Sequence, residues 1–352
     1  MSRNISLLLF LTVILGTLIV VSSQNWFVIW VGLEISTLAL VPLLCSNFSP
    51  RNIEATIKYF LIQALSAALL LNGAMIQAWL TGSWSILEPS NNVTMLCISI
   101  ALAFKIGLAP CHFWFPDVLQ GLPFTQGLII ASWQKIAPLV LIFSISNTTF
   151  SYLLISASLI SIVVGGWGGL NQTQTRKILA FSSIANMGWI TVTALYSTQA
   201  AIIMLIIYLL INTAVFLLLD LLTLSTLGHL NNTAQLSPIS IILITMLILS
   251  LGGLPPLTGF MLKFTSLYFL ISNNFIMLSA IMVLGSLLSL FFYIRISFNV
   301  SLVLFPQHIV SLTAWRNSMS TTYLPANTWM ASSLSTIGIL AIPLTLPLYI
   351  II

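Results

Sequence analysis

The chain has 352 residues, of which 59% are hydrophobic and only 4% are charged, and its net charge is +5. A soluble domain carries about a quarter charged residues, so this composition excludes a soluble protein and indicates an all-α protein that crosses a membrane several times. The three cysteines, Cys45, Cys97 and Cys111, show no CxxC spacing, so neither a metal site nor a disulfide framework is expected.

A helix that crosses a bilayer needs about 20 apolar residues. This criterion predicts eleven spans, which in chain order cover residues 4–23, 25–45, 55–79, 92–115, 124–145, 150–170, 177–196, 200–224, 238–271, 276–297 and 329–351. Arg3 is the only charge before the first span, and no small-residue cleavage site follows that span, so we expect a retained helix and not a signal peptide. Segment 298–328 is more polar and predicts a loop on the inner face.

The fourth and ninth spans contain helix breakers. The fourth holds Pro110, and the ninth holds Gly253, Pro255 and Pro256. Proline removes a backbone donor, and glycine permits turns that other residues resist. Backbone groups freed at membrane depth are tolerated only where protein or a water-filled cavity covers them. We therefore expect both breaks to border a hydrated interior site.

The positions of the two breaks suggest an internal repeat. If spans one to five and six to ten are two copies, each break is fourth in its copy. Five is an odd number, so the second copy enters the membrane from the other side, as in an inverted-topology repeat. We predict a single membrane domain with a first repeat at 1–148, a second at 149–297, an inner-face loop at 298–328 and a last helix at 329–352.

The charges outside the spans predict the orientation. When the spans alternate in direction, seven bases fall on one face, namely Arg3, Arg51, Lys58, Arg176, Lys177, Arg295 and Arg316. The opposite loops contain only Glu88. The positive-inside rule then makes the basic face the cytoplasmic or matrix face, with the N-terminus inside and the C-terminus outside. The positive net charge thus indicates orientation, and no nucleic-acid partner is expected.

Four titratable residues fall within spans: Glu34, Lys105, Lys135 and Lys263. Burial disfavours the charged form of a lysine, and a nearby carboxylate favours it, so such a group can gain and lose a proton. Glu34 and Lys135 lie about 14 and 16 Å into their spans, near the middle of a core about 30 Å thick. The two other lysines lie beside the breaks. Together they predict a lateral row for proton transfer, whereas a static buried pair involving Glu34 would leave two lysines unpaired.

The remaining polar residues give weaker signals. His112 could equally be a proton relay or a hydrogen-bonded interior histidine. Asp220 is expected near the interface, and Asp117 and the Glu54–Lys58 pair are expected to be solvated. The sequence has no Gly-rich phosphate loop, no GxGxxG after a strand and no cluster of His or Cys ligands. We therefore expect no nucleotide, flavin, haem, iron–sulfur centre or metal in this chain.

Four separated motifs carry a resemblance to a known family: "AFKIGLAPCHFWFPDVLQG", "WQKIAPL", "SSIANMGW" and "SLGGLPPLTGFMLKF". At these motifs, and over essentially its whole length, the chain resembles the chain 2 family of mitochondrial NADH–ubiquinone oxidoreductase, antiporter-like core subunits of respiratory complex I. The resemblance implies proton translocation across the mitochondrial inner membrane, coupled to electron transfer from NADH to ubiquinone. It places the N-terminus in the matrix and the C-terminus in the intermembrane space.

The resemblance also implies partners and cofactors. The expected partners are other membrane-arm subunits, including neighbouring antiporter-like chains and accessory subunits, together with lipids. FMN, iron–sulfur clusters and ubiquinone are expected elsewhere in the complex, with no redox chemistry in this chain.

Residue roles follow from the same resemblance. It implies that Glu34 and Lys105 are the coupling pair of the first repeat, that Lys135 is the central link, and that Lys263 lies nearest the outer exit. This sequence has Asn186 where some relatives carry histidine. Since asparagine does not titrate, a relay there needs water or a hydroxyl, for which the candidates are Ser182 and Ser183. Asp220 has no match in the family pattern.

Two other functions explain the same features. A stand-alone cation/proton antiporter would also need helix breaks and buried lysines, but it would exchange cations in liposomes as an independent unit. A non-pumping scaffold of the complex would tolerate loss of the interior lysines. The mass of the intact assembly in mild detergent, and whether that assembly oxidises NADH, would separate a complex subunit from a free antiporter.

Overall fold

The computed structural model describes residues 3–46, 48–86, 91–145, 151–222, 224–228, 238–255, 257–303 and 326–340. These residues form helices and, apart from two isolated β-bridges, no strands. Within them, eight helical segments are long and apolar enough to cross a membrane. The prediction of an all-α polytopic membrane protein is therefore confirmed.

The elements follow one another in this order: α1 Arg3–Ser22, α2 Trp26–Leu44, α3 Pro50–Thr81, α4 Asn92–Ile106, α5 Trp114–Gly121, α6 Phe124–Leu128, the π-helix η1 Ile129–Trp133, α7 Gln134–Ile145, α8 Ser151–Gly169, α9 Thr175–Tyr196, α10 Thr198–Leu221, α12 Pro238–Gly252, α13 Thr258–Ser272, α14 Ile276–Val303 and α16 Ala326–Leu340. Most ends lie within a few residues of the predicted spans. The exceptions have local causes.

Helix α3 starts five residues earlier than predicted. The Ser49 hydroxyl accepts a 3.3 Å hydrogen bond from the Asn52 N–H, and Pro50 occupies the first turn, so the N-terminus is capped although its first two turns are polar. At the other end, Gly82 adopts a left-handed conformation with φ 72°. A prediction based on the length of an apolar stretch does not include polar turns that are capped in this way, so it places the start of α3 too late.

The C-terminal region differs from the prediction in a similar way. Helix α14 continues to Val303, and α16 begins at Ala326, so both ends of the expected loop 298–328 are helical. The sequence "FNVSLV" that closes α14 is apolar enough to prolong the helix. Residues 304–325 and 341–352, with most of that loop and the end of the last predicted span, lie outside the described residues.

Both predicted breaks interrupt a helix. Helix α4 ends at Ile106 and is followed by Gly107, which has φ 80°; α5 begins at Trp114, with Pro110 between the two helices. In the second break, Gly253 has φ 79° and follows α12, and α13 begins at Thr258. Pro255 lies in this break, and Pro256 lies outside the described residues. In both cases a left-handed glycine terminates the first half of the pair.

A third interruption was not expected from the sequence. The predicted span 124–145 forms α6, the π-helix η1 and α7. Pro138, inside α7, offers no N–H to the carbonyl of Gln134, four residues earlier. A π-helical turn often occurs at functional sites, and this one immediately precedes the turn that carries Lys135.

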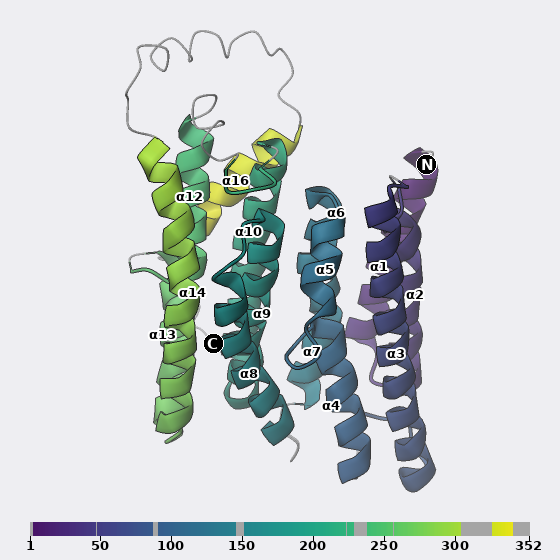
Figure 1. Ribbon diagram of the computed structural model, residues 1–352. Coiled ribbons are helices and arrows are strands. Elements are labelled where there is room, and N and C mark those ends of the chain that lie inside the picture. The colour runs from purple at the N-terminus through teal and green to yellow at the C-terminus, as the bar shows by residue number, and fades with distance from the viewer. Residues whose placement is uncertain are drawn as a thin grey trace.

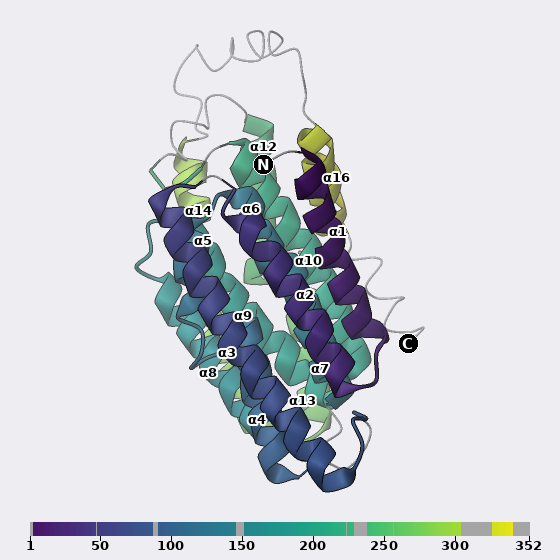
Figure 2. The ribbon, with the colours of Figure 1, turned by 90° about the vertical axis from the view of Figure 1, so that its right-hand side faces the viewer.

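The helices form two groups that meet at the centre of the bundle. Figure 1 shows α1–α3 on one side, α8–α14 on the other, and α4–α7 between them. Helices α5 and α7 contact α9, and α6 and η1 contact α10. Figure 2 shows α1, α2 and α3 side by side along nearly one direction, as expected for helices that cross a bilayer together.

Helix α9 is at the centre and α1 is at the edge. In the most apolar stretch of each helix, 83% of the residues of α9 are buried, compared with 22% of those of α1. The outer helix instead exposes large apolar side chains such as Leu8, Leu11 and Leu18, which suits contact with lipid. Polar residues on α9 therefore lie in the interior.

Candidate functional site

Glu34 and Lys105 face each other across the first group of helices without touching. Lys105, in the last turn of α4, is buried and interacts electrostatically with the half-buried Glu34 of α2. Glu34 Oε2 accepts a 3.2 Å hydrogen bond from the Thr37 hydroxyl, and no hydrogen-bond partner reaches Lys105 Nζ. Among the described residues, the closed ion pairs are those of Lys58 with other carboxylates.

One cavity links Lys105 with Lys135. Both lysines line it, together with the uncharged polar residues Thr37, Tyr59, Gln63 and Gln134. Its free space is about 10 Å³, roughly the room that one water molecule needs. The Tyr59 hydroxyl and the Gln134 amide nitrogen are buried without hydrogen-bond partners in the structure. The cavity therefore offers free polar groups between the two amines.

Sequence reasoning did not single out these four uncharged residues, although a signal was present. Buried polar side chains recur on α3 at helical spacing, at Asn52, Thr56, Tyr59, Gln63 and Ser66. Steps of three and four residues place such side chains on one face of a helix. A polar stripe on an otherwise apolar span indicates a face that looks into the protein.

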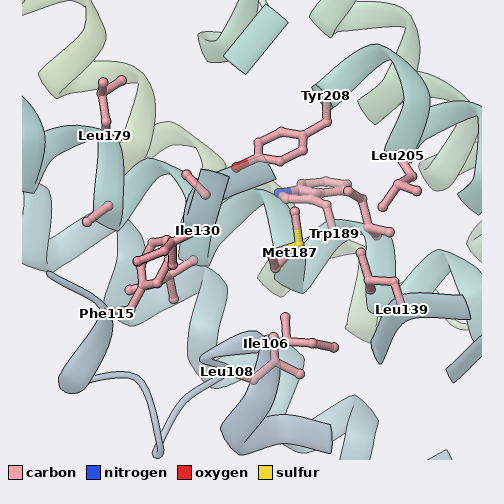
Figure 3. Packing of buried hydrophobic residues seen from close by; sticks show 14 of the residues in the cluster. Ile106, Leu108, Phe115, Ile130, Leu139, Leu179, Met187, Trp189, Leu205 and Tyr208 are labelled. Atoms are coloured by element: carbon pink, nitrogen blue, oxygen red, sulfur yellow. The ribbon is translucent and has the colours of Figure 1, made fainter. Parts of the chain in front are cut away.

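Lys135 lies between two aromatic rings. It is 2% exposed, and its Nζ is 4.4 Å from the centroid of the Phe115 ring and 5.8 Å from that of the Tyr208 ring. Its amine has no hydrogen-bond partner in the structure. Aromatic faces attract an ammonium group within about 6 Å of the ring centroid, so these rings stabilise the charged form without fixing it by hydrogen bonds. Figure 3 shows Phe115 and Tyr208 in the packed core, with Ile130 between them.

Lys263 is tied to the second break. Its Nζ donates a 2.7 Å hydrogen bond to the carbonyl oxygen of Gly252, the last residue of α12. It also lines a small cavity with Asn186, Tyr208 and Ser250, which has about 20 Å³ of free space, room for one or two water molecules. The break thus supplies the lysine with a free backbone acceptor and a polar cavity.

The two serines on α9, Ser182 and Ser183, lie beside tyrosine hydroxyls. Both are buried, and Ser182 and Ser183 donate hydrogen bonds of 2.8 and 2.7 Å to the carbonyls of Leu179 and Ala180. Ser183 faces the Tyr208 hydroxyl, and Ser182 faces that of Tyr293. Because the serine hydrogens are already used, each serine oxygen is available chiefly as an acceptor.

His112 is in a different place. It is 5% exposed, its Nδ1 has no hydrogen-bond partner in the structure, and it lines a cavity of about 420 Å³ with Asp117, Gln172 and Lys177. It does not line the cavity of Lys105 and Lys135. Asp220, near the end of α10, is half-buried and lines none of these three cavities.

Over the described ranges, no group of three or more His, Cys, Asp or Glu side chains could hold a metal ion. The site is instead a series of buried lysines, separated by small polar cavities, that runs through both groups of helices. Two of its members lie next to helix breaks. This arrangement defines an antiporter-like membrane protein.

Comparison with known proteins gives the family. The family described as "NADH:quinone oxidoreductase/Mrp antiporter, TM" matches residues 23–289, and the "NADH dehydrogenase subunit 2 C-terminus" matches residues 290–349. The chain is 70% identical to "NADH-ubiquinone oxidoreductase chain 2" of Strongylocentrotus purpuratus, over 100% of both chains. It belongs to the NADH-ubiquinone oxidoreductase chain 2 family.

Solved structures agree in fold. A chain of respiratory complex I from Thermus thermophilus superimposes with a TM-score of 0.82 and 27% identity, covering 99% of this chain and 80% of that one. A chain of the Mrp complex from Dietzia superimposes with a TM-score of 0.77 and 20% identity, covering 82% of this chain and 59% of that one. The second likeness concerns the fold alone.

Proposed function

We propose that this chain is a core membrane subunit of respiratory complex I that moves protons across the mitochondrial inner membrane, coupled to electron transfer from NADH to ubiquinone. Membership of the chain 2 family supports its place in the complex. One observation supports the transfer itself: Lys105 and Lys135 line the same small cavity, beside polar groups that are free to hold water.

The proposed route runs from Glu34 through Lys105 and Lys135 to Lys263. Two ammonium groups at one buried cavity repel each other strongly because the protein interior screens charge poorly. When Lys105 is protonated, protonation of Lys135 is therefore disfavoured. When Lys105 releases its proton, Lys135 takes one up more easily. The open geometry of Glu34 and Lys105 suits this role, because small movements of the carboxylate would change the charge on the lysine.

The cavity at His112 offers a route for protons from the inner side. Its other polar members, Asp117, Gln172 and Lys177, lie in or near segments that we assign to the inner end of the bundle. At that end, Arg176 donates to the Leu122 carbonyl, and Arg295 donates to the carbonyls of Leu170 and Gln172. We propose that water in this cavity brings protons to His112, which passes them toward the lysines.

The finer topology is part of the proposal. We assign eleven spans, two inverted repeats at 1–148 and 149–297, a matrix N-terminus and an intermembrane-space C-terminus. The helix pairs α4–α5 and α12–α13 support the repeat, since each is interrupted by a left-handed glycine at the fourth place of its half. The partners are other membrane-arm subunits and lipids, and FMN, iron–sulfur clusters and ubiquinone lie in other subunits.

A stand-alone antiporter is less well supported. The likeness to the Mrp complex chain concerns the fold, at 20% identity, whereas the match to the chain 2 relative from Strongylocentrotus purpuratus extends over the whole chain at 70% identity. A non-pumping scaffold does not explain why two buried lysines and the half-buried Lys263 lack carboxylate ion pairs in the described structure. Experiments on lysine variants and on the isolated chain separate both alternatives from the proposed function.

The deciding experiment is Lys135→Met in the intact complex, reconstituted into liposomes. Methionine keeps the length and apolar packing of the side chain and removes titration. We expect the complex to assemble while proton pumping driven by NADH falls by at least roughly tenfold, the factor that corresponds to about 1.4 kcal/mol on the barrier. The control is Lys58→Met, which changes an exposed ion-paired lysine. Normal pumping by assembled Lys135→Met would favour the scaffold, and cation exchange by the isolated chain would favour the antiporter.

A further inference from the structure

The row of lysines is interrupted between Lys135 and Lys263. The cavity that holds Lys135 and the cavity that holds Lys263 have no lining residue in common. A proton that moves from the first of these cavities to the second therefore passes the residues that separate them. A residue that borders both lysines is positioned to control this step.

Tyr208 lies at this interruption. Its ring is one of the two that hold the Lys135 amine, at 5.8 Å from Nζ to the centroid. The same side chain lines the cavity of Lys263, together with Asn186 and Ser250. In the described structure, no other residue both holds Lys135 by an aromatic ring and lines the Lys263 cavity. In Figure 3, the hydroxyl of Tyr208 points away from its helix and into the core, beside Trp189 of α9.

The hydroxyl of Tyr208 is free to act. It is buried, and it faces Ser183 without completing a regular hydrogen bond. The Ser183 hydroxyl already donates to the Ala180 carbonyl, so its oxygen remains available as an acceptor. A buried hydroxyl without a partner costs free energy. Ser183 lies within reach of this hydroxyl, and water or a lysine amine can serve as a second partner.

We propose that Tyr208 relays and gates proton passage from Lys135 to Lys263. The inference rests on the proposed function, because it assigns the step between two members of the proposed route. Its ring holds the Lys135 ammonium, and its hydroxyl connects that amine, through water, with the cavity of Lys263. A hydroxyl both donates and accepts, so one proton arrives from Lys135 as the hydroxyl proton leaves through water to Lys263. Lys135 ends neutral, Lys263 ends charged, and Tyr208 is unchanged.

Tyr208→Phe tests the hydroxyl alone, since it keeps the ring beside Lys135. In the intact complex in liposomes, we expect normal assembly and a roughly fivefold loss of the pumping rate, which corresponds to about 1 kcal/mol on the barrier. The solvent deuterium isotope effect on pumping should increase, because a proton transfer becomes slower. A purely structural role would not change the isotope effect. The matched control is Tyr196→Phe, whose ring packs on Phe275 at the far end of α9.

The outcomes separate this inference from the proposed function. If Lys135→Met pumps normally, the proposed function is wrong. If Lys135→Met is impaired but Tyr208→Phe pumps like the unmodified protein, only the role of Tyr208 is wrong. Should Tyr208→Phe assemble poorly, Ser183→Ala decides, because it removes the acceptor that faces the hydroxyl and changes little volume. We expect about a twofold loss there with a raised isotope effect, and normal values would overturn the inference.

Discussion

The ammonium group of Lys263 donates a 2.7 Å hydrogen bond to the carbonyl oxygen of Gly252, the residue that ends α12. The last carbonyls of a helix lack intrahelical donors, and the negative end of the helix dipole favours a nearby cation. The break and the lysine are thus complementary. The interrupted helix supplies the Gly252 carbonyl as an acceptor at membrane depth. Lys263 donates a hydrogen bond to this carbonyl, which lipid cannot do.

Gly253 makes this approach possible, which gives a first prediction. A Cβ at this position would lie 2.9 Å from Cδ of Lys263, and the residue has φ 79°. We expect Gly253→Ala to lower stability by about 1–3 kcal/mol through backbone strain and also to displace Lys263. Thermal inactivation of the complex and NADH-driven pumping measure the two effects.

Gly82→Ala is the matched control for that variant. Gly82 has a similar φ of 72°, but a Cβ there meets no atom within 4 Å. Gly82→Ala should lower stability through backbone strain, as Gly253→Ala does, with little loss of pumping. Equal loss of pumping in both alanine variants would mean that the Gly253 contact with Lys263 has no functional weight.

The lysine itself is the subject of the second prediction. Lys263→Met keeps the side-chain length but leaves the Gly252 carbonyl without its donor. We expect assembly to persist and pumping per NADH oxidised to fall by at least roughly tenfold, about 1.4 kcal/mol on the barrier. Pumping is measured as acidification inside proteoliposomes. If the assembled variant acidifies them as fast as the unmodified complex, Lys263 is only a packing group at the break.

Orientation gives a third prediction. Arg51 is exposed at the start of α3, and Asn91 is exposed just before α4, at the opposite end of the bundle. In sealed mitoplasts, a membrane-impermeant thiol reagent should label Asn91→Cys at once and Arg51→Cys only after the membrane is opened. The reverse pattern would overturn the assigned topology and, with it, the inverted repeat.

Much of the fold was predictable because lipid imposes a length on each apolar stretch. The breaks were predictable because Pro110, Gly253 and Pro255 are poor helix formers at places where lipid does not permit free backbone groups. The capped, polar start of α3 and the π-helix η1 were not. The first depends on a side-chain cap at Ser49, and the second lies where this segment contacts α10, far along the chain.

Only the charged residues of the candidate site could be predicted from the sequence. A lysine within a span stands out in a chain that is only 4% charged. Tyr59, Gln134 and Tyr208 do not, because uncharged polar residues occur in most of the predicted spans. Their importance depends on which cavity each one lines, which is a property of tertiary packing. The structure also separates His112 from the cavity of Lys105, although the two residues are only seven positions apart in the sequence.

Glu34 provides the last prediction. Its carboxylate accepts a hydrogen bond from the Thr37 hydroxyl and influences Lys105 from a distance, without a closed ion pair. In Glu34→Gln the amide oxygen can still accept from Thr37, so packing and assembly should be kept while the charge is lost. Lys105 then loses the carboxylate that favours its charged form, and proton-coupled turnover should fall by roughly tenfold, about 1.4 kcal/mol on the barrier. Glu54→Gln is the control, because it removes an equal charge from an exposed pair with Lys58. The measurement is pumping per NADH oxidised in assembled complex, and equal values for the two glutamine variants would remove Glu34 from the coupling route.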